Sequence, residues 1–241
     1  MWTNAIVVGA SSGIGAVLAQ KLAAQGTQVA AIARRQEQLD ELASGSDKIR
    51  TYVHDVVAYD DAPSVFDQIQ ADLGEIDLIV YCAGVMPEIE EHEYNFAKDR
   101  AQLEVNLVGA VNWLNLAAAH MESRRKGTIV GISSVAGDRG RRGSPVYTAS
   151  KGGLTTYLEA LRNRIHRYSV HVVTVKPGPV RTPMTDGLGD MPFMIDADKA
   201  ADGVLKLARK GTGSGYVPLI WWPIMTIIRL VPSFIFRKTN V

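Results

Sequence analysis

The alternation of short apolar runs with longer helical stretches is the feature that most restricts how this chain can fold. Runs rich in β-branched residues predict strands over 5–8, 28–32, 50–53, 78–81, 128–132 and 170–175. Helical patterns lie between them, over 14–25, 36–43, 62–73, 100–125 and 148–168. Near-continuous apolar strands are typical of a parallel sheet that is covered on both faces. We therefore predict an α/β fold with a doubly wound parallel sheet flanked by helices.

Composition excludes several classes of protein. No repeat, low-complexity linker or long charge run divides the 241 residues, so we expect one domain over 1–241. The net charge of +1 gives no general attraction to nucleic acid. Cys82 is the only cysteine, so no intrachain disulfide can form and nothing requires an oxidising compartment. The five histidines lack cysteine partners and metalloprotease spacing, so we expect no metal site.

The two ends of the chain carry little sign of targeting. The first four residues lack the basic region of a signal peptide. Segment 216–238 is strongly apolar, but Pro218, Pro223, Arg229 and Pro232 interrupt it, and a spanning helix needs about 20 mostly apolar residues. We expect a cytoplasmic protein whose segment 216–238 covers a pocket, joins subunits or makes a peripheral contact with a membrane.

The first strand is followed by a glycine-rich turn that leads directly into a helix. It reads Gly9-Ala10-Ser11-Ser12-Gly13-Ile14-Gly15. Glycines allow a tight turn and a close approach of the backbone to a pyrophosphate, and the helix N-terminus offers free N–H groups. The position predicts a dinucleotide site in the first βα turn of a Rossmann-like domain. Three residues separate the first two glycines, a spacing that resembles the short-chain dehydrogenase/reductase family.

The end of the second strand indicates which dinucleotide binds. Enzymes that use NAD usually place an acidic residue there for the ribose 2′-hydroxyl, whereas this chain has Arg34 and Arg35. A guanidinium can bind a 2′-phosphate through two hydrogen bonds. We predict NADP(H) as the cofactor, with Arg34 as the first choice and the hydroxyl of Ser11 or Ser12 assisting. The alternative is that both arginines are solvated residues at the start of the next helix.

The resemblance extends to the segments after the third and fourth strands. It implies that Asp55 and Val56 contact the adenine, although Asp55 alone also fits a turn or a helix cap. Ala83 and Gly84 match the family's usual Asn-Asn-Ala-Gly, and small residues suit a backbone packed against a cofactor. Cys82 departs from that pattern, and we interpret it as a small buried hydrophobe rather than a reactive thiol.

Tyr147 and Lys151 form the most informative pair. They stand four residues apart in a predicted helix, so both side chains can reach one site. A tyrosine with its ordinary pKa near 10 is a poor base at neutral pH. A nearby cation favours the phenolate and lowers that pKa. The alternative is a surface pair, because an isolated Tyr-x-x-x-Lys motif is weak evidence.

Ser134 and Asn106 strengthen the reading of Tyr147 as a proton-transfer group. Ser134 stands 13 residues before Tyr147 at the end of a strand, and the resemblance implies that it binds the substrate oxygen. Ser133 is the competing residue, but alternate side chains of a strand face opposite sides. Asn106 lies within a predicted helix, where its amide could simply be satisfied by backbone. The resemblance implies instead that it perturbs the helix and holds a water linking Lys151 to solvent.

The segments after the sixth strand are expected to complete the site. The resemblance implies that the 177–182 stretch closes on the nicotinamide through Pro177, Gly178, Val180 and Thr182. We expect 183–199 to be a substrate loop, because it carries Met184, Met191, Phe193 and Met194. The arginines of 138–143 could meet an acidic substrate tail or a carrier, although a solvated loop fits them better.

Together these residues predict an NADP(H)-dependent oxidoreductase that interconverts a ketone or aldehyde and an alcohol on an apolar or amphipathic small molecule. One alternative is a reductase of 3-oxoacyl thioesters, for which the apolar segment 216–238 is unexpected. Another is a non-catalytic NADP-binding regulator, which would not need the set of Asn106, Ser134, Tyr147 and Lys151. The resemblance also implies a homodimer or homotetramer formed through the helices predicted over 100–125 and 148–168.

Overall fold

Seven parallel strands form the main sheet in the structure, a computed structural model that describes residues 2–187, 189, 191–211 and 213–239. Across the sheet they run β3 (Ile49–Val53), β2 (Gln28–Ala33), β1 (Asn4–Val8), β4 (Leu78–Tyr81), β5 (Gly127–Ile132), β6 (Val170–Pro177) and β9 (Ser214–Val217). A separate short pair joins β7 (Val180–Arg181) to β8 (Ile195–Asp196). The strand order reverses between β1 and β4, which confirms the doubly wound, Rossmann-like α/β fold.

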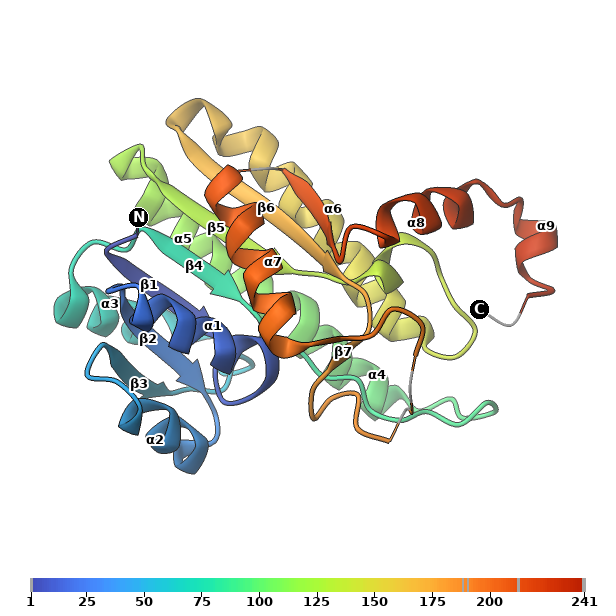
Figure 1. The fold of residues 1–241 in the computed structure, drawn as a ribbon, viewed down its shortest axis with the longest axis horizontal. Helices are drawn as coiled ribbons and strands as arrows, with labels where there is room; N and C mark the ends of the chain where they lie inside the picture. Colours follow the sequence, from blue (N-terminus) through green and yellow to red (C-terminus); the bar gives the residue numbers. More distant parts are fainter. Residues whose placement is uncertain (1, 188, 190, 212, 240–241) are drawn as a thin grey trace.

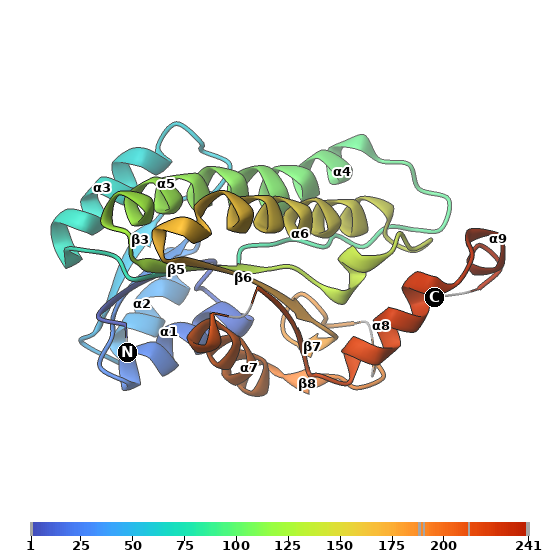
Figure 2. The same ribbon diagram turned by 90° about the horizontal axis from the view of Figure 1, so that it is seen from above.

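Helices cover both faces of the sheet (Figure 1, Figure 2). One face carries α1 (Gly13–Ala24), α2 (Gln36–Ser44) and α7 (Ala197–Lys210). The other face carries α3 (Ala62–Leu73), α4 (Phe96–Leu103), α5 (Gly109–Arg124) and α6 (Pro145–Ile165). The last two helices, α8 (Trp221–Leu230) and α9 (Ser233–Phe236), project from one end of the molecule (Figure 1). Within the described ranges, no helix is both long and apolar enough to cross a bilayer.

The central apolar strands are buried on both sides, because their alternate side chains join two separate cores. In β1, Ile6 and Val8 join the core under α3, α5 and α6, whereas Ala5 and Val7 join the core under α1 and α7. All four are fully buried. This two-sided burial is the physical reason for the continuous apolar runs, since neither face of a strand meets water.

The helix predicted over 100–125 is perturbed in its middle, at the turn that carries Asn106, as the resemblance implies. The chain forms α4, then a π-helical turn, η1 (Glu104–Val108), and then α5. Tyr81 stabilises this turn, because its hydroxyl donates to the carbonyl oxygen of Val105 at 2.7 Å. A Cβ at Gly109 would lie 2.8 Å from that hydroxyl, so only glycine fits there. The turn carries Asn106, and such turns often occur at functional sites.

The last third of the chain holds more regular structure than predicted. Segment 183–199 includes β8 and the start of α7, and two of its positions, Leu188 and Asp190, lie outside the described residues. The helices and the seventh strand after residue 196 were missing from the prediction. The helix predicted over 148–168 begins at Pro145 instead, and its end is a 3₁₀ turn, η3 (His166–Tyr168). A second 3₁₀ turn, η2 (Val135–Asp138), follows β5.

Candidate active site

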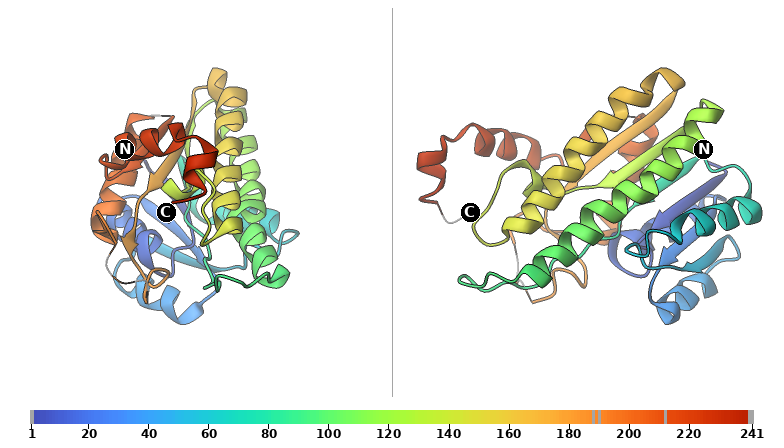
Figure 3. Two further views of the ribbon diagram at one scale, coloured as in Figure 1. Left: turned by 90° about the vertical axis from the view of Figure 1, so that its right-hand side faces the viewer. Right: turned by 180° about the vertical axis from the view of Figure 1, so that it is seen from behind.

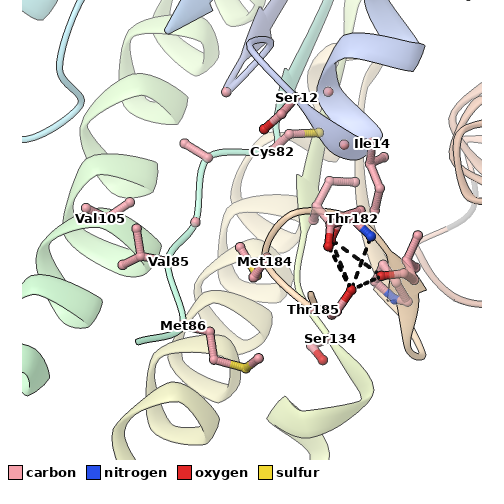
Figure 4. A pocket seen from close by; sticks show the side chains of 18 of the residues that line it. Ser12, Ile14, Cys82, Val85, Met86, Val105, Ser134, Thr182, Met184 and Thr185 are labelled. Atoms are coloured by element: carbon pink, nitrogen blue, oxygen red, sulfur yellow. Dashed lines mark hydrogen bonds between the residues drawn. The ribbon is translucent and has the colours of Figure 1, made fainter. Parts of the chain in front are cut away.

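A cavity of about 570 Å³ opens at the carboxyl ends of β1, β4, β5 and β6 (Figure 4). This is the edge of a doubly wound sheet where ligands bind, next to the point where the strand order reverses. The volume lies within the range of small-molecule and cofactor sites. Every predicted cofactor-binding residue lines it, and so do Ser134, Tyr147 and Lys151. Asn106 does not stand among the lining residues.

The glycine turn is as tight as the spacing predicts. Gly9 has a φ of +90°, and a Cβ there would lie 2.5 Å from the backbone nitrogen of Ala83. A Cβ at Gly15 would lie within overlap distance of the Gly9 carbonyl oxygen. Helix α1 begins at Gly13, directly beside the cavity. The turn therefore brings unpaired N–H groups of a helix N-terminus to the space where a pyrophosphate would lie.

The two arginines after β2 differ in their contacts. Arg35 donates from Nη2 to the hydroxyl oxygens of Ser11 and Ser12, both at 2.8 Å. Arg34 instead lies beside Asp55, with 3.5 Å between Nη1 and Oδ2. The structure thus differs from the expected grouping, which put Arg34 with the serines. The reason is local, because Arg35 is the N-cap residue of α2 and lies over the glycine turn.

The segments after β3 and β4 form a further side of the cavity. Asp55 accepts a hydrogen bond from the backbone of Val57 at 3.2 Å, as a turn residue does. A Cβ at Gly84 would lie 3.5 Å from Nζ of Lys151, so this glycine lets the backbone pass close to the lysine. Burial raises the pKa of the Cys82 thiol to about 12, so it is protonated at neutral pH. That agrees with the interpretation of Cys82 as a small apolar residue.

Ser133 and Ser134 face different surroundings. The Ser133 hydroxyl is buried and donates to the carbonyl oxygen of Lys151 at 2.9 Å. The Ser134 and Tyr147 side chains both line the cavity, and Ser134 lowers the pKa of the Tyr147 hydroxyl as a hydrogen-bond partner does. Ser134 also caps η2 by accepting from the backbone of Ala136 at 3.0 Å. The strand alternation therefore turns Ser134, not Ser133, toward Tyr147.

Lys151 lies deep in the site, 4% exposed. Its ammonium donates to the carbonyl oxygen of Ile132 at 3.0 Å, and lies 5.9 Å from the ring centroid of Tyr147. Burial lowers the pKa of Lys151 to about 8, because a charged amine loses its hydration there. The groups that lower the pKa of Tyr147 in this geometry are Ser134 and Arg141, and the lowering expected from Lys151 stays a prediction.

Arg141 supplies the positive charge that acts on Tyr147. Burial raises the pKa of Tyr147 above its ordinary value, whereas the Ser134 hydrogen bond and the charge of Arg141 lower it. Arg141 lines the cavity, in the segment between Ser134 and Tyr147. The prediction treated this segment as a solvated loop, which is wrong for Arg141. Only its charge and its place between two candidate residues could have identified it.

Asn106 is fully buried and holds neighbouring segments together. Its amide donates to the carbonyl oxygen of Val85 at 2.9 Å and accepts from the Val85 backbone nitrogen at 2.7 Å. It also donates to the hydroxyl of Ser150 on α6 at 3.2 Å. The side chain thus ties the π turn to the segment after β4 and to the helix of Tyr147.

The stretch after β6 folds over the cavity (Figure 4). Thr182 lies against the glycine turn, since its Cγ2 would be 3.1 Å from a Cβ at Gly13. Trp221 of α8 fills the space beside Gly178, where a Cβ would overlap the indole nitrogen. Trp221 also contacts Phe193 edge to face, with 6.0 Å between ring centroids. The prediction named Trp221 only as part of an apolar segment, not as a wall of the site.

Arg139 connects the site to the end of the chain. Its guanidinium donates to the carbonyl oxygens of Ile228, Arg229 and Val231 at 2.9, 3.0 and 2.6 Å. The ring of Phe236 lies 4.3 Å from its Cζ. These acceptors close the C-terminal end of α8, whose last carbonyls lack partners within the helix. Arg139 therefore stabilises the C-terminal end of α8 and is not a solvated residue. We call this set of contacts the Arg139 clamp.

A parallel sheet with a glycine turn beside its strand-order reversal, and with serine, tyrosine and lysine in the same cavity, defines the class of a dinucleotide-dependent oxidoreductase. Comparison with known families identifies the group within this class, because residues 3–192 match the model of the short chain dehydrogenase family. The chain belongs to the short-chain dehydrogenase/reductase family.

Individual relatives agree with this assignment. An uncharacterized oxidoreductase of Mycobacterium tuberculosis is 30% identical over 94% of this chain and 91% of its own length. A 3-oxoacyl-[acyl-carrier-protein] reductase of Bos taurus is 32% identical over 76% of this chain and 78% of its own. A solved short chain dehydrogenase/reductase family protein has a TM-score of 0.81 and 27% identity, over 89% of this chain and 94% of that one.

Proposed function

We propose that the protein is an NADP(H)-dependent reductase of ketones or aldehydes, or catalyses the reverse oxidation, on an apolar or amphipathic small molecule. The observation that carries the proposal is that Ser134, Tyr147 and Lys151 line the same cavity as the glycine turn. One side of that cavity suits a dinucleotide, and the other presents a proton donor to whatever lies beside it.

The residues present fit NADP(H). The glycine turn leaves room for a pyrophosphate against the backbone, where any Cβ would collide. Arg35, with the hydroxyls of Ser11 and Ser12, forms a polar group suited to a 2′-phosphate. Val180 and Thr182 would hold the carboxamide end, as the family resemblance implies. The nicotinamide supplies or accepts the hydride when it is bound.

The chain's own residues would then transfer the proton to or from the substrate oxygen. Ser134 and Tyr147 hold the substrate oxygen, and Tyr147 donates its hydroxyl proton to that oxygen during reduction. The charge of Arg141 stabilises the phenolate that remains. Lys151, ordered by the Ile132 carbonyl, contributes a second cation below its pKa of about 8. We assign Asn106 the completion of a proton relay from Lys151, because it fixes the segment that passes beside the amine.

The substrate class follows from the cavity wall opposite the glycine turn. The side chains there are apolar, and they comprise Val85, Met86, Val105, Met184, Met191 and Trp221. Methionine side chains adapt to irregular apolar shapes. The wall thus favours a substrate whose carbonyl group is attached to an apolar body.

A second candidate is reduction of a 3-oxoacyl thioester, which the name of the bovine relative favours. A carrier-linked substrate would need basic residues free to meet an acidic carrier. Arg139 and Arg141 are committed to the clamp and to Tyr147, so this candidate ranks second. A non-catalytic NADP-binding regulator ranks third, because a sensor needs no proton donor.

The test combines a substrate screen with one variant. NADPH oxidation is followed with steroid, aryl, aliphatic and acyl-thioester ketones, and Tyr147→Phe is expected to lower turnover of any active substrate at least about a hundredfold. NADPH binding to this variant is expected to remain. Tyr157→Phe is the matched control, because that hydroxyl lies on the same helix but bonds Asn115 at an exposed position. Full turnover by Tyr147→Phe would remove the tyrosine from its role.

A further inference from the structure

Helix α8 and the short segments on either side of it leave a large apolar surface uncovered. We call it the outer patch, and it comprises the exposed side chains of Leu219, Ile220, Trp222, Ile227, Leu230, Phe234 and Ile235. Leu230 is 78% exposed and Phe234 is 63% exposed. Single exposed apolar residues are ordinary, but a contiguous set on one segment marks a surface that another body covers.

The inner side of the same helix is already occupied. Met225 is fully buried and Trp221 lines the cavity, while Arg139 holds the carbonyl end. Helix α8 is thus apolar on both sides, with Thr226 and Arg229 as its only polar residues. A helix that is apolar all round belongs in a core or in a lipid environment. Because these inner contacts fix the position of α8, the helix cannot rotate to bury the outer patch against the protein.

The distribution of charged residues around the outer patch indicates which kind of surface it suits. None of the chain's 25 acidic residues lies after Asp202. The basic residues beyond that point are Lys206, Arg209, Lys210, Arg229, Arg237 and Lys238. Arg229, Arg237 and Lys238 lie within or next to the outer patch and are exposed. Apolar side chains flanked by arginine and lysine, without acids, match the boundary of an anionic bilayer.

A second copy of the chain is a poorer partner for the same surface. Symmetric pairing would bring Arg229, Arg237 and Lys238 of both copies together without an acidic residue from either segment to offset them. The loop before α4, which carries Glu88, Glu90 and Glu91, lies below α8 and α9 in Figure 1. Arg142 already lies 3.7 Å from Glu91 on that side.

We propose that the outer patch docks the protein on the surface of an anionic lipid bilayer, with α8 lying in the interface. Helix α8 then lies between the bilayer and the cavity, because Trp221 on its inner side is part of the cavity wall. Figure 3 shows α8 and α9 standing out beyond the sheet and its covering helices, so the body of the protein does not obstruct this contact. The proposal concerns binding alone and does not depend on the proposed chemistry.

The experiment is flotation of the full chain with vesicles of phosphatidylcholine, with and without phosphatidylglycerol. The chain is expected to float with the anionic vesicles and to be released as salt rises. The triple variant Ile227→Gln, Leu230→Gln and Phe234→Gln is expected to bind at least about tenfold more weakly. Arg237→Gln with Lys238→Gln is expected to lose about fivefold in affinity for each charge removed, on anionic vesicles only.

Controls separate the outer patch from general stickiness and from misfolding. Phe96→Gln removes an equally exposed aromatic from α4 and is expected to leave flotation unchanged. All variants should keep the thermal unfolding transition of the parent, because the substituted side chains are exposed. Three results would each overturn the proposal: a parent chain that does not float, a Phe96 variant as impaired as the triple variant, or a triple variant that floats like the parent. A parent that stays in solution as a dimer, with a monomeric triple variant, would assign the surface to a second copy.

Discussion

Arg141 gives Tyr147 a charged neighbour that the motif itself does not contain. The guanidinium favours the phenolate, and so opposes the rise that burial causes in the tyrosine pKa. Such a residue would decide the pH at which the hydroxyl changes from proton donor to proton acceptor. Its influence can be measured without substituting Ser134 or Tyr147.

Arg141→Met is expected to raise the pKa of Tyr147, because the charge that favours the phenolate is removed. Reduction needs the protonated hydroxyl, so its decline at alkaline pH should move to higher pH. Alcohol oxidation needs the phenolate, so it should become about tenfold slower at neutral pH. The measurement is the pH profile of both directions. Arg142→Met is the control, since Arg142 is exposed and does not line the cavity; identical profiles for parent and Arg141→Met would contradict the assignment.

Arg35 is expected to determine the choice between the two nicotinamide dinucleotides. Arg35→Ala should raise the dissociation constant of NADPH by roughly ten- to a hundredfold, because a charge-assisted hydrogen bond to the 2′-phosphate is lost. NADH, which lacks that phosphate, should change little. Arg34→Ala is the matched comparison and should have the smaller effect, since Arg34 lies beside Asp55. Equal losses for both dinucleotides, measured by fluorescence titration, would exclude the 2′-phosphate contact.

The residues of the site could be predicted to different degrees. Ser134, Tyr147 and Lys151 lie together because their spacing is set by one strand end and one helix, which local rules describe. The choice between Arg34 and Arg35 depends on which of them lies over the glycine turn, and sequence spacing does not contain that information. The role of Arg139 depends on contacts about 90 residues away along the chain.

At the scale of elements, a buried polar cluster joins η2 to the sheet. Lys176 on β6 lies 2.5 Å from Asp138, and the Tyr216 hydroxyl on β9 donates to the same carboxylate at 2.6 Å. The lysine and aspartate side chains are only 8% and 3% exposed. The cluster therefore fixes the start of the segment that carries Arg139 and Arg141.

Asp138→Asn is expected to lower the free energy of unfolding by about 3 kcal/mol, because it leaves a buried ammonium without its counter-charge. Denaturant unfolding measures this change. Asp198→Asn is the control, since its ion pair with Lys21 is largely exposed, and it should cost less than about 1 kcal/mol. A double variant of Asp138→Leu and Lys176→Met should recover part of the loss. Equal costs for the two single variants would contradict the buried cluster.

Most elements up to β6 follow from apolar periodicity, but the π turn, helix α7 and strand β9 did not. The π turn is invisible to a periodic pattern because a single extra residue in a helix changes the phase without changing composition. Helix α7 was missed although its buried residues recur with helical spacing, from Ala200 through Val204 to Ala208. Strand β9 is short, and glycine at its second position weakens the strand pattern.

The assembly of the whole molecule with further copies of itself depends on which of its faces suit a close contact. Helices α5 and α6 lie side by side on one face (Figure 3), where Asn115, Ala119, Thr156 and Ala160 are exposed. Small side chains allow two such faces to approach closely. We propose, in line with the family resemblance, that this face joins two copies in a homodimer or in one half of a homotetramer.

Ala160→Arg is expected to reduce the assembly to smaller units, since a guanidinium would be buried without a partner at the contact. Analytical ultracentrifugation of parent and variant measures the change. Ser44→Arg on α2 adds the same side chain at an exposed position on the opposite face of the sheet and should have no effect. A parent that sediments as a monomer would refute the assembly.

The Arg139 clamp has a consequence for how ligands influence one another. The segment that contains Arg139 also carries Arg141, whose charge acts on the Tyr147 hydroxyl. The guanidinium of Arg139 binds the last turn of α8. A ligand that orders the helix therefore also orders the segment, and a ligand that orders the segment also orders the helix. Thermodynamic reciprocity requires the two effects to be equal in free energy. Binding of a ligand in the cavity and binding of the outer patch to a bilayer would then be positively cooperative, with Arg139 as the point of coupling.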